Sequence, residues 1–252
     1  MSQDNFDRRF ARIELMIGKP GLRKLNNSFV VVAGLGAVGG YAVEALARAG
    51  VGHIRLVDFD EIKPSNINRQ LYALDSTIGR PKVDVAAERI LDINPKCHIE
   101  KLKCFVHKET LDTVLADKPD IIVDAIDSFN PKLELLTAIQ IQSLTVISAM
   151  GAAMRSDPSM VRLGPLKEVK NCPLARQMRK KLRQRELNLT FPCVYSLEPL
   201  GDFEFEEDPQ TSEQILERGR KRRVLPSLPT LTGIFGLTAA NWTIQYLIKD
   251  VK

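Results

Sequence analysis

Short runs rich in β-branched residues alternate with longer segments of helical period over the first 150 residues of the chain. Runs of this length and composition are typical of strands, and apolar residues that recur every three or four positions indicate amphipathic helices. We predict strands at 29–33, 53–58, 98–103, 121–124 and 146–149. The predicted helices lie between them, at 38–49, 82–93, 108–116 and 132–142.

Strict alternation of strands and helices implies right-handed crossovers and helices on both faces of a parallel sheet. The predicted fold class is therefore α/β, with a doubly wound, Rossmann-like, mostly parallel sheet. The regularity ends after Gly151, so we expect a nucleotide-binding domain at 1–151 and an elaborated C-terminal region at 152–252 that completes the same fold. The elements expected in that region are a strand at 160–163, an amphipathic helix at 172–185 and a strand within 191–200.

The apolar segment 230–248 has two interpretations. Its 19 residues carry no charge, and that length reaches across a bilayer. It also contains four threonines, Asn241 and Gln245, which a lone span would expose to lipid at some cost. We therefore predict a helix buried in the core and no membrane insertion.

A glycine-rich turn follows the first predicted strand. The segment VVVAGLGAVGG contains Gly34, Gly36 and Gly39 between a strand and a helix. Glycines at this spacing let backbone N–H groups approach phosphate oxygens at the helix N-terminus. Asp58 ends the second strand 19 residues after Gly39, which is the right distance to meet a ribose hydroxyl. Together these residues predict a nucleotide site.

The loop after the second strand distinguishes between nucleotides. It and the start of the next helix supply Asp60, Asn66, Asn68, Arg69, Gln70 and Lys82. An arginine and a lysine that converge on the glycine loop suit a triphosphate and would be surplus for a dinucleotide. Asp124 and Asp127 end the fourth strand, and a carboxylate facing a polyphosphate is best explained by magnesium. The sequence therefore predicts ATP and Mg²⁺ and argues against a dehydrogenase.

Charge is unevenly distributed along the chain. The first 150 residues contain 19 Lys/Arg and 19 Asp/Glu, and the last 102 contain 17 and 12, so the net charge of +5 arises in the C-terminal region. Seven bases and no acid lie within 170–185, which indicates either an anion or nucleic-acid surface or a solvated helix face. The segment 198–217 has eight acids and no base, and we expect it to be solvated. The basic run RGRKRR follows at 218–223.

The four cysteines are widely spaced and form no C-x-x-C pair. This argues against a structural zinc site and for free thiols in a reducing compartment. The N-terminus lacks the apolar core of a signal peptide, so we expect a cytoplasmic protein. Cys193 is either catalytic or a small buried hydrophobe. We expect His53, His98 and His107 to be structural, because they lie away from the motifs.

Four segments together resemble the ATP-binding domain of the ubiquitin-activating-enzyme-like (ThiF) superfamily, whose members adenylate carboxylates. They are GLGAVGG, DFDEIKPSNINRQ, IGRPKVDVAAERILDINP and DAIDS. The resemblance runs from about Arg9 to Gly151 and implies that residues 1–151 form an ATP-binding adenylation domain. The roles that it implies are ribose contact by Asp58, phosphate contact by Asn66, Arg69 and Lys82, and magnesium binding by Asp127. Catalytic roles are thus implied for Arg69, Lys82 and Asp127.

Arg12, in RFARIEL, matches an arginine that reaches the neighbouring subunit's ATP in this superfamily, which implies a homodimer with Arg12 as a fourth catalytic residue. Further along, CPLARQMRKKLRQR and PCVYSLE resemble the branch that dehydrates threonylcarbamoyladenosine in tRNA. That branch forms an acyl-adenylate and then closes a ring with loss of AMP, which implies tRNA as a partner. The chain lacks the two zinc-binding C-x-x-C pairs of the branch that activates sulfur carriers.

Two alternatives stay open. One is an adenylyltransferase that activates the C-terminus of a ubiquitin-like or sulfur-carrier protein. The other is a nucleotide-binding module without turnover, against which the presence of Arg69, Lys82 and Asp127 argues. Proteins of a sulfurtransferase system are further candidate partners.

Overall fold

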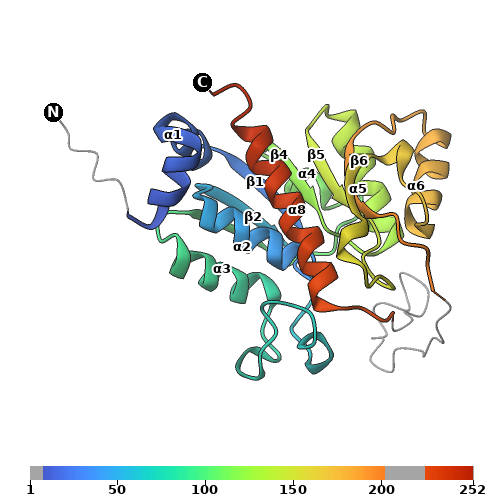
Figure 1. Ribbon diagram of the computed structural model, residues 1–252, viewed down its shortest axis with the longest axis horizontal. Coiled ribbons are helices and arrows are strands. Elements are labelled where there is room, and N and C mark those ends of the chain that lie inside the picture. Colours follow the sequence, from blue (N-terminus) through green and yellow to red (C-terminus); the bar gives the residue numbers. More distant parts are fainter. Residues whose placement is uncertain (1–7, 202–224, 252) are drawn as a thin grey trace.

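A seven-stranded sheet forms the centre of the computed structural model, which describes residues 8–201 and 225–251 (Figure 1). Its strands are β1 (Phe29–Ala33), β2 (His53–Val57), β3 (His98–Leu102), β4 (Ile121–Asp124), β5 (Val146–Ala149), β6 (Val161–Pro165) and β7 (Pro192–Ser196). They lie in the order β3-β2-β1-β4-β5-β7-β6, and every neighbouring pair is parallel except β6 and β7. This confirms the predicted α/β fold class. Residues 202–217 of the acid-rich segment and the basic run 218–223 lie outside the described residues.

Helices cover both faces of the sheet (Figure 1). The α-helices are α1 (Ala11–Asn26), α2 (Gly39–Ala49), α3 (Lys82–Ile93), α4 (Leu111–Val114), α5 (Phe129–Ile141), α6 (Pro173–Gln184) and α8 (Pro229–Leu247). The short 3₁₀ helices are η1 (Arg8–Phe10), η2 (Pro64–Asn66), η3 (Asp75–Thr77), η4 (Pro158–Met160) and η5 (Leu166–Glu168).

Two helices differ from the predictions. The predicted set lacks α1, because Gly18, with a φ of 72°, and Pro20 interrupt the apolar period. The helix predicted at 108–116 is reduced to α4. There the Thr110 hydroxyl accepts a hydrogen bond from the His107 N–H at 3.0 Å, and this local bond stabilises a turn where the pattern predicts the first helical turn.

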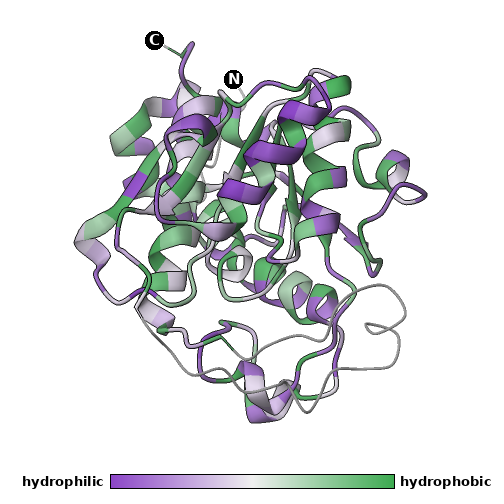
Figure 2. Ribbon diagram, turned by 90° about the vertical axis from the view of Figure 1, so that its right-hand side faces the viewer, coloured by the Kyte–Doolittle hydropathy of each residue, from purple (hydrophilic) through white to green (hydrophobic). Residues whose placement is uncertain are grey.

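The residues of β1 alternate between two cores, because successive side chains of a strand point to opposite faces. Val30 and Val32 pack with apolar residues of α2, α3 and α8. Val31 and Ala33 pack with those of α4, α5 and α6. Figure 2, which views the molecule from the side of α6, shows hydrophobic strands inside and hydrophilic residues on the helices nearest the viewer. Burial on both faces is the usual state of a parallel sheet.

The uncharged segment 230–248 forms α8, which packs across α2 (Figure 1). A Cβ at Gly236 would lie 2.2 Å from the Val38 carbonyl oxygen, so glycine is what allows the two helices to approach. Phe235 and Ala239 are fully buried in the same core. The prediction of a core helix is therefore confirmed. None of the described helices is long and apolar enough to cross a membrane.

The strand order reverses between β1 and β4. From β1 the chain adds β2 and β3 on one side of β1, and it then returns to place β4 on the other side of β1. The loops that follow these two strands, 34–38 and 125–128, therefore meet at the carboxyl edge of the sheet. A Cβ at Gly34 would lie 2.8 Å from the Ala125 carbonyl oxygen, which shows how closely the loops touch. Such a switch point is where open α/β sheets bind their ligands.

Candidate nucleotide site

The glycine loop has two glycines that the fold itself requires and one that it does not. Gly34 has a φ of +90°, and a Cβ at Gly39 would lie 1.7 Å from the Gly34 carbonyl oxygen. A Cβ at Gly36 would meet only Gln70 Nε2, at 3.8 Å. Gly36 therefore faces open space at the N-terminus of α2, where a phosphate finds backbone N–H groups and the positive end of the helix dipole.

The Asp58 carboxylate connects the glycine loop to the end of β2. Its Oδ2 accepts the Leu35 N–H at 2.7 Å, and its Oδ1 accepts the Asp60 N–H at 2.8 Å. Asp58 is 9% exposed, and this burial raises the pKa of its carboxyl, while the nearby Lys82 ammonium opposes the rise. Each carboxylate oxygen keeps a second lone pair, so the oriented group can still accept a ribose hydroxyl.

Lys82 is held at the base of the site. Its backbone N–H donates to the Asp60 backbone carbonyl oxygen at 3.1 Å, and its side-chain ammonium donates to Asp60 Oδ2 at 3.0 Å. The side chain is only 5% exposed, so its charge is largely removed from water and depends on Asp60 and Asp58 for compensation. The ammonium is thus fixed in position by Asp60, and phosphate contact by Lys82 stays a prediction.

The polar loop after β2 is organised by its own side chains. Asn66 Oδ1 accepts the Lys63 N–H at 3.1 Å and so caps η2. Arg69 donates to the Ser65 carbonyl oxygen at 3.0 Å and to Asn68 Oδ1 at 2.8 Å. The contacts that we find for Asn66, Asn68 and Arg69 lie within this loop, whereas Gln70 reaches the glycine loop. Phosphate contact by Asn66 and Arg69, and nucleotide binding by Asn68, stay predictions.

Asp124 and Asp127 do not form a pair at this site. Asp124 is fully buried, and its Oδ2 accepts Lys132 Nζ at 2.8 Å and the Ser148 hydroxyl at 2.6 Å. Its Oδ1 accepts the Ile126 N–H at 3.2 Å, and Lys132 also donates to the Ile126 carbonyl oxygen at 2.9 Å. The Asp124 carboxylate is therefore occupied by groups of the protein, and of the two acids only Asp127 is exposed. The network holds in place the loop that carries Asp127.

Asp127 is exposed on the loop that touches Gly34. Its Oδ1 accepts a hydrogen bond from the Ser128 hydroxyl at 3.2 Å. Mg²⁺ is commonly held by one or two carboxylates together with waters and phosphate oxygens. A single exposed carboxylate beside the glycine loop fits that ion.

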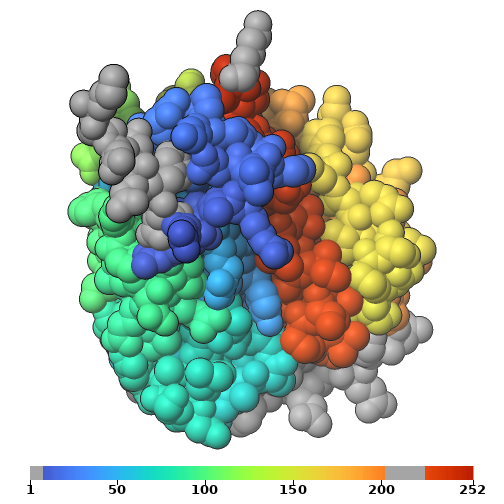
Figure 3. All heavy atoms as spheres, turned by 60° about the vertical axis from the view of Figure 1, so that its left-hand side comes forward, coloured from blue at the N-terminus to red at the C-terminus, as the bar shows by residue number. Residues whose placement is uncertain are grey.

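The structure does not bring Arg12 to the nucleotide site of its own chain. Arg12 is exposed near the start of α1, two residues after Phe10, whose ring packs against Gly50. Gly50 caps the C-terminus of α2, whereas the glycine loop lies at the N-terminus of α2. The eleven residues of α2 span about 16 Å, so the start of α1 lies at the end of α2 that is away from the glycine loop. Figure 3 shows α1 on the surface, beside α8.

Cys193 lies in β7 and is fully buried. Burial raises the pKa of its thiol, so the nucleophilic thiolate is disfavoured. Of the two interpretations of Cys193, the structure supports the small buried hydrophobe.

The basic helix predicted at 172–185 is α6. It buries one face in the core and exposes Arg176, Lys180 and Arg183 along another. We call these three residues the basic stripe, because their spacing of four and three places them on one side of the helix. Arg179 behaves differently: its Nη1 donates to the Val169 carbonyl oxygen at 2.6 Å, so it contributes to the fold.

Comparison with known proteins gives one family model, two relatives and one solved structure. The family model described as ThiF family matches residues 6–252. A protein of Bacillus subtilis (strain 168) named tRNA threonylcarbamoyladenosine dehydratase is 38% identical over 245 residues, 96% of each chain. A Haemophilus influenzae protein of the same name is 31% identical, over 98% of this chain and 95% of its own. The solved structure of E. coli tRNA N6-threonylcarbamoyladenosine dehydratase in complex with ATP matches with a TM-score of 0.85 at 27% identity, over 99% of this chain and 98% of its own.

Proposed function

Because the chain belongs to the ThiF family, we propose that it is an ATP-dependent tRNA threonylcarbamoyladenosine dehydratase. The observation that carries this proposal is the similarity to the Bacillus subtilis dehydratase at 38% identity over 96% of both chains. A match that includes the last 102 residues argues for the dehydratase over a relative that shares only the nucleotide-binding part. The open space at Gly36 and the buried cation Lys82 fit the triphosphate that this reaction consumes.

In the first step, a carboxylate oxygen of the threonyl group attacks the α-phosphorus of ATP, and pyrophosphate leaves. Adenylation is needed because a carboxylate oxygen is itself a poor leaving group. Lys82, Arg69 and Arg12 of the partner subunit neutralise the charge that develops on pyrophosphate. Asp58 orients the ribose. Mg²⁺, held by Asp127 when bound, supplies further positive charge at the phosphates.

In the second step, an internal nitrogen of the substrate attacks the activated acyl carbon and displaces AMP. The nitrogen loses its proton to solvent, and the carboxylate oxygen leaves on AMP, so the modified nucleoside loses one water in total. This step needs no thioester, which is consistent with the burial of Cys193. All four cysteines are free thiols, as expected of the reducing cytoplasm in which we propose that the enzyme works.

The assay for this proposal is mass spectrometry of tRNA nucleosides. Purified protein, ATP and Mg²⁺ are incubated with tRNA that carries threonylcarbamoyladenosine. We expect that nucleoside to lose the mass of one water only when ATP is present, with AMP and pyrophosphate formed in equal amounts. ATP consumption that depends on an added carrier protein and leaves the tRNA nucleoside unchanged would instead favour the adenylyltransferase alternative.

We place the chemistry in residues 1–151 and the tRNA contact in 152–252, on the basic stripe of α6. Exposed cations bind the phosphate backbone and release counterions, and each contact contributes roughly one unit to the slope of log affinity against log salt. Replacing Arg176, Lys180 and Arg183 together by Gln is therefore expected to weaken tRNA binding and to flatten the slope by up to about three units. Fluorescence anisotropy with labelled tRNA at several salt concentrations measures both quantities.

The matched control replaces three exposed lysines that lie outside α6, namely Lys96, Lys108 and Lys118. It removes the same charge, so a shared loss of affinity would mean that net charge alone attracts tRNA. ATP affinity is expected to stay unchanged in both triple variants. If the stripe variant binds tRNA as the parent does, the stripe is a solvated helix face and the tRNA contact lies elsewhere.

We further propose a homodimer in which α1 lies at the interface. Leu15 and Met16 on α1 are 87% and 83% exposed, which is unusual for large apolar side chains and supports coverage by a partner. Arg12 precedes them and is remote from its own site. Mixing inactive Arg12→Ala and Lys82→Ala subunits is expected to restore up to about a quarter of wild-type activity, because half of the dimers are mixed and each holds one intact site. No rescue after demonstrated subunit exchange would remove Arg12 from the partner's site.

A further inference from the structure

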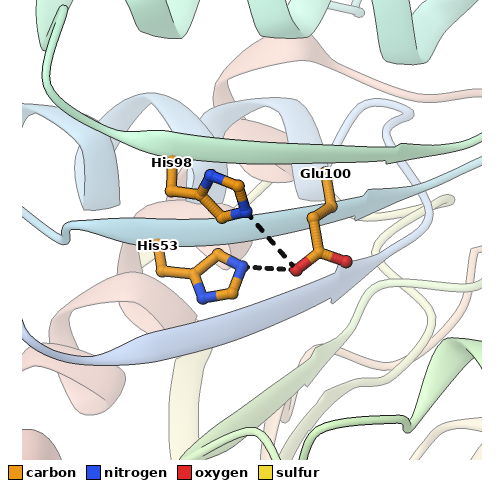
Figure 4. Close-up of side chains that lie close together, drawn as sticks. All are labelled: His53, His98 and Glu100. Carbon is orange, nitrogen blue, oxygen red and sulfur yellow. Dashed lines mark hydrogen bonds and ion pairs between the residues drawn. The ribbon is translucent and has the colours of Figure 1, made fainter.

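A cluster of side chains that can coordinate a metal lies on β2 and β3 (Figure 4). His53 begins β2, His98 begins β3, and the two are directly paired in register. Glu100 stands two residues after His98 and so points to the same face. The His53 Nε2 to Glu100 Oε1 distance is 2.5 Å, and the His98 Nε2 to Glu100 Oε1 distance is 3.9 Å.

We propose that His53, His98 and Glu100 bind one divalent transition-metal ion, for which Zn²⁺ is the probe, and that the ion fastens the edge strand β3 to β2. Two imidazoles and one carboxylate are a donor set that zinc accepts, with a fourth position open to water. Bond lengths near 2.1 Å at a tetrahedral centre separate ligand atoms by about 3.4 Å. The observed 2.5 and 3.9 Å lie on either side of that value, and all three ligand atoms lie within 4.8 Å of one another.

The surrounding residues orient these ligands. Arg55 Nε donates to Glu100 Oε2 at 2.8 Å, which leaves Oε1 directed at the imidazoles. Arg55 Nη2 also pairs with Asp117 Oδ2 at 2.7 Å, so the guanidinium charge is compensated near the ion. The Phe29 ring stacks on His53 at a centroid distance of 3.8 Å and fixes the plane of the imidazole. Partners of this kind, one shell beyond the ligands, tune metal affinity.

Ion binding changes one hydrogen bond of the cluster. Coordination uses the Nε2 lone pair of His53, so the imidazole then carries its proton on Nδ1. The ion takes the place of the proton that now lies between His53 and Glu100. The His98 side chain is 68% exposed and that of His53 is 27% exposed, which gives an ion a direct path from solvent.

This cluster is separate from the nucleotide site. His53 and His98 lie at the amino ends of β2 and β3. The nucleotide site lies beyond the carboxyl ends of the strands, near Asp58. Five steps of about 3.3 Å each put roughly 16 Å between His53 and Asp58 along the chain. The ion therefore acts on the sheet edge and does not replace Mg²⁺ at Asp127.

The test uses the untagged full-length chain and ZnCl₂ in isothermal titration calorimetry. We expect one saturable site per chain and at least a tenfold loss of affinity in His98→Ala, since even residues around a metal's ligands are worth about 10–100-fold. His98 is exposed, so the variant is expected to fold. Zn²⁺ is expected to raise the unfolding midpoint of the wild type and not that of His98→Ala. His107→Ala is the matched control, because His107 is the third histidine of the chain and lies outside the cluster.

Co²⁺ provides a spectroscopic check on the ligands. Its d–d bands lie in the visible, and thiolate ligands add a strong charge-transfer band in the near ultraviolet that nitrogen and oxygen ligands lack. We expect no such band, because the Cys97 side chain, next to His98, is buried and its thiol donates to the His98 carbonyl oxygen at 3.7 Å. The proposal is overturned if the wild type shows no saturable Zn²⁺ binding, if His98→Ala binds Zn²⁺ as the wild type does, or if thiolate bands appear.

Discussion

The buried ion pair between Lys132 and Asp124 offers a quantitative test of how the site is supported. Lys132 is fully buried in α5, and its ammonium contacts Asp124 Oδ2 at 2.8 Å and the Ile126 carbonyl oxygen at 2.9 Å. Lys132→Met keeps a long side chain and removes the charge and both hydrogen bonds. Asp124 then keeps the Ser148 hydroxyl and the Ile126 N–H as partners, but no cation.

Removing one partner of a buried pair costs about 3–5 kcal/mol, because the remaining charge is left uncompensated. For a chain of this length, each kcal/mol lowers the unfolding midpoint by about 2–4 °C. We therefore expect Lys132→Met to lower the midpoint by on the order of 10 °C. Below that midpoint we also expect slower turnover, because Lys132 fixes the Ile126 carbonyl in the loop that carries Asp127.

Thermal and urea unfolding, followed by circular dichroism, measure the loss of stability for Lys132→Met, Asp124→Asn and the double variant. The double variant is expected to be more stable than the sum of the single losses predicts, because it leaves neither charge uncompensated. Lys96→Met is the matched control, since Lys96 is exposed. A midpoint for Lys132→Met equal to that of the control, or strictly additive losses, would refute the reasoning.

Two further substitutions test the chemistry itself. Asp127→Ala is expected to leave the unfolding midpoint unchanged, because Asp127 is exposed, and to abolish dehydration while weakening ATP binding less, as calorimetry and the nucleoside assay measure. Wild-type activity in this variant would assign the magnesium to other ligands. Cys193→Ala is expected to retain turnover and to lose on the order of 1 kcal/mol of stability through the small cavity. A folded Cys193→Ala protein without turnover would instead require a thioester step.

The features that were predicted from the sequence are those that neighbouring residues determine. The β-branched runs predict the strands of the sheet, since their period depends only on local geometry. Gly34 and Gly39 predict the turn. Gly34 has a positive φ, and the backbone approaches Gly39 too closely to leave room for a side chain. Asp58 follows at the distance that two strands and one helix require. The nucleotide site was therefore predictable to the level of its loops.

Other assignments needed contacts between distant segments. Asp124 looks like a second magnesium ligand in the sequence, and only packing shows that Lys132 and Ser148 occupy it. The pattern of its helix does not mark Lys132 as buried, because the same helix also contains Asn130 and Glu134. Arg179 resembles its exposed neighbours on α6, yet it donates to the Val169 carbonyl oxygen.

His53 and His98 lie 45 positions apart, and neither belongs to a motif. They come together because β2 and β3 pair in a register that sets His53 beside His98. The sequence determined which groups carry charge, where the chain turns and which face of each element is apolar. The tertiary structure decided which of those groups is buried and which partner compensates it, because a charge removed from water is stable only beside the group that packing brings to it.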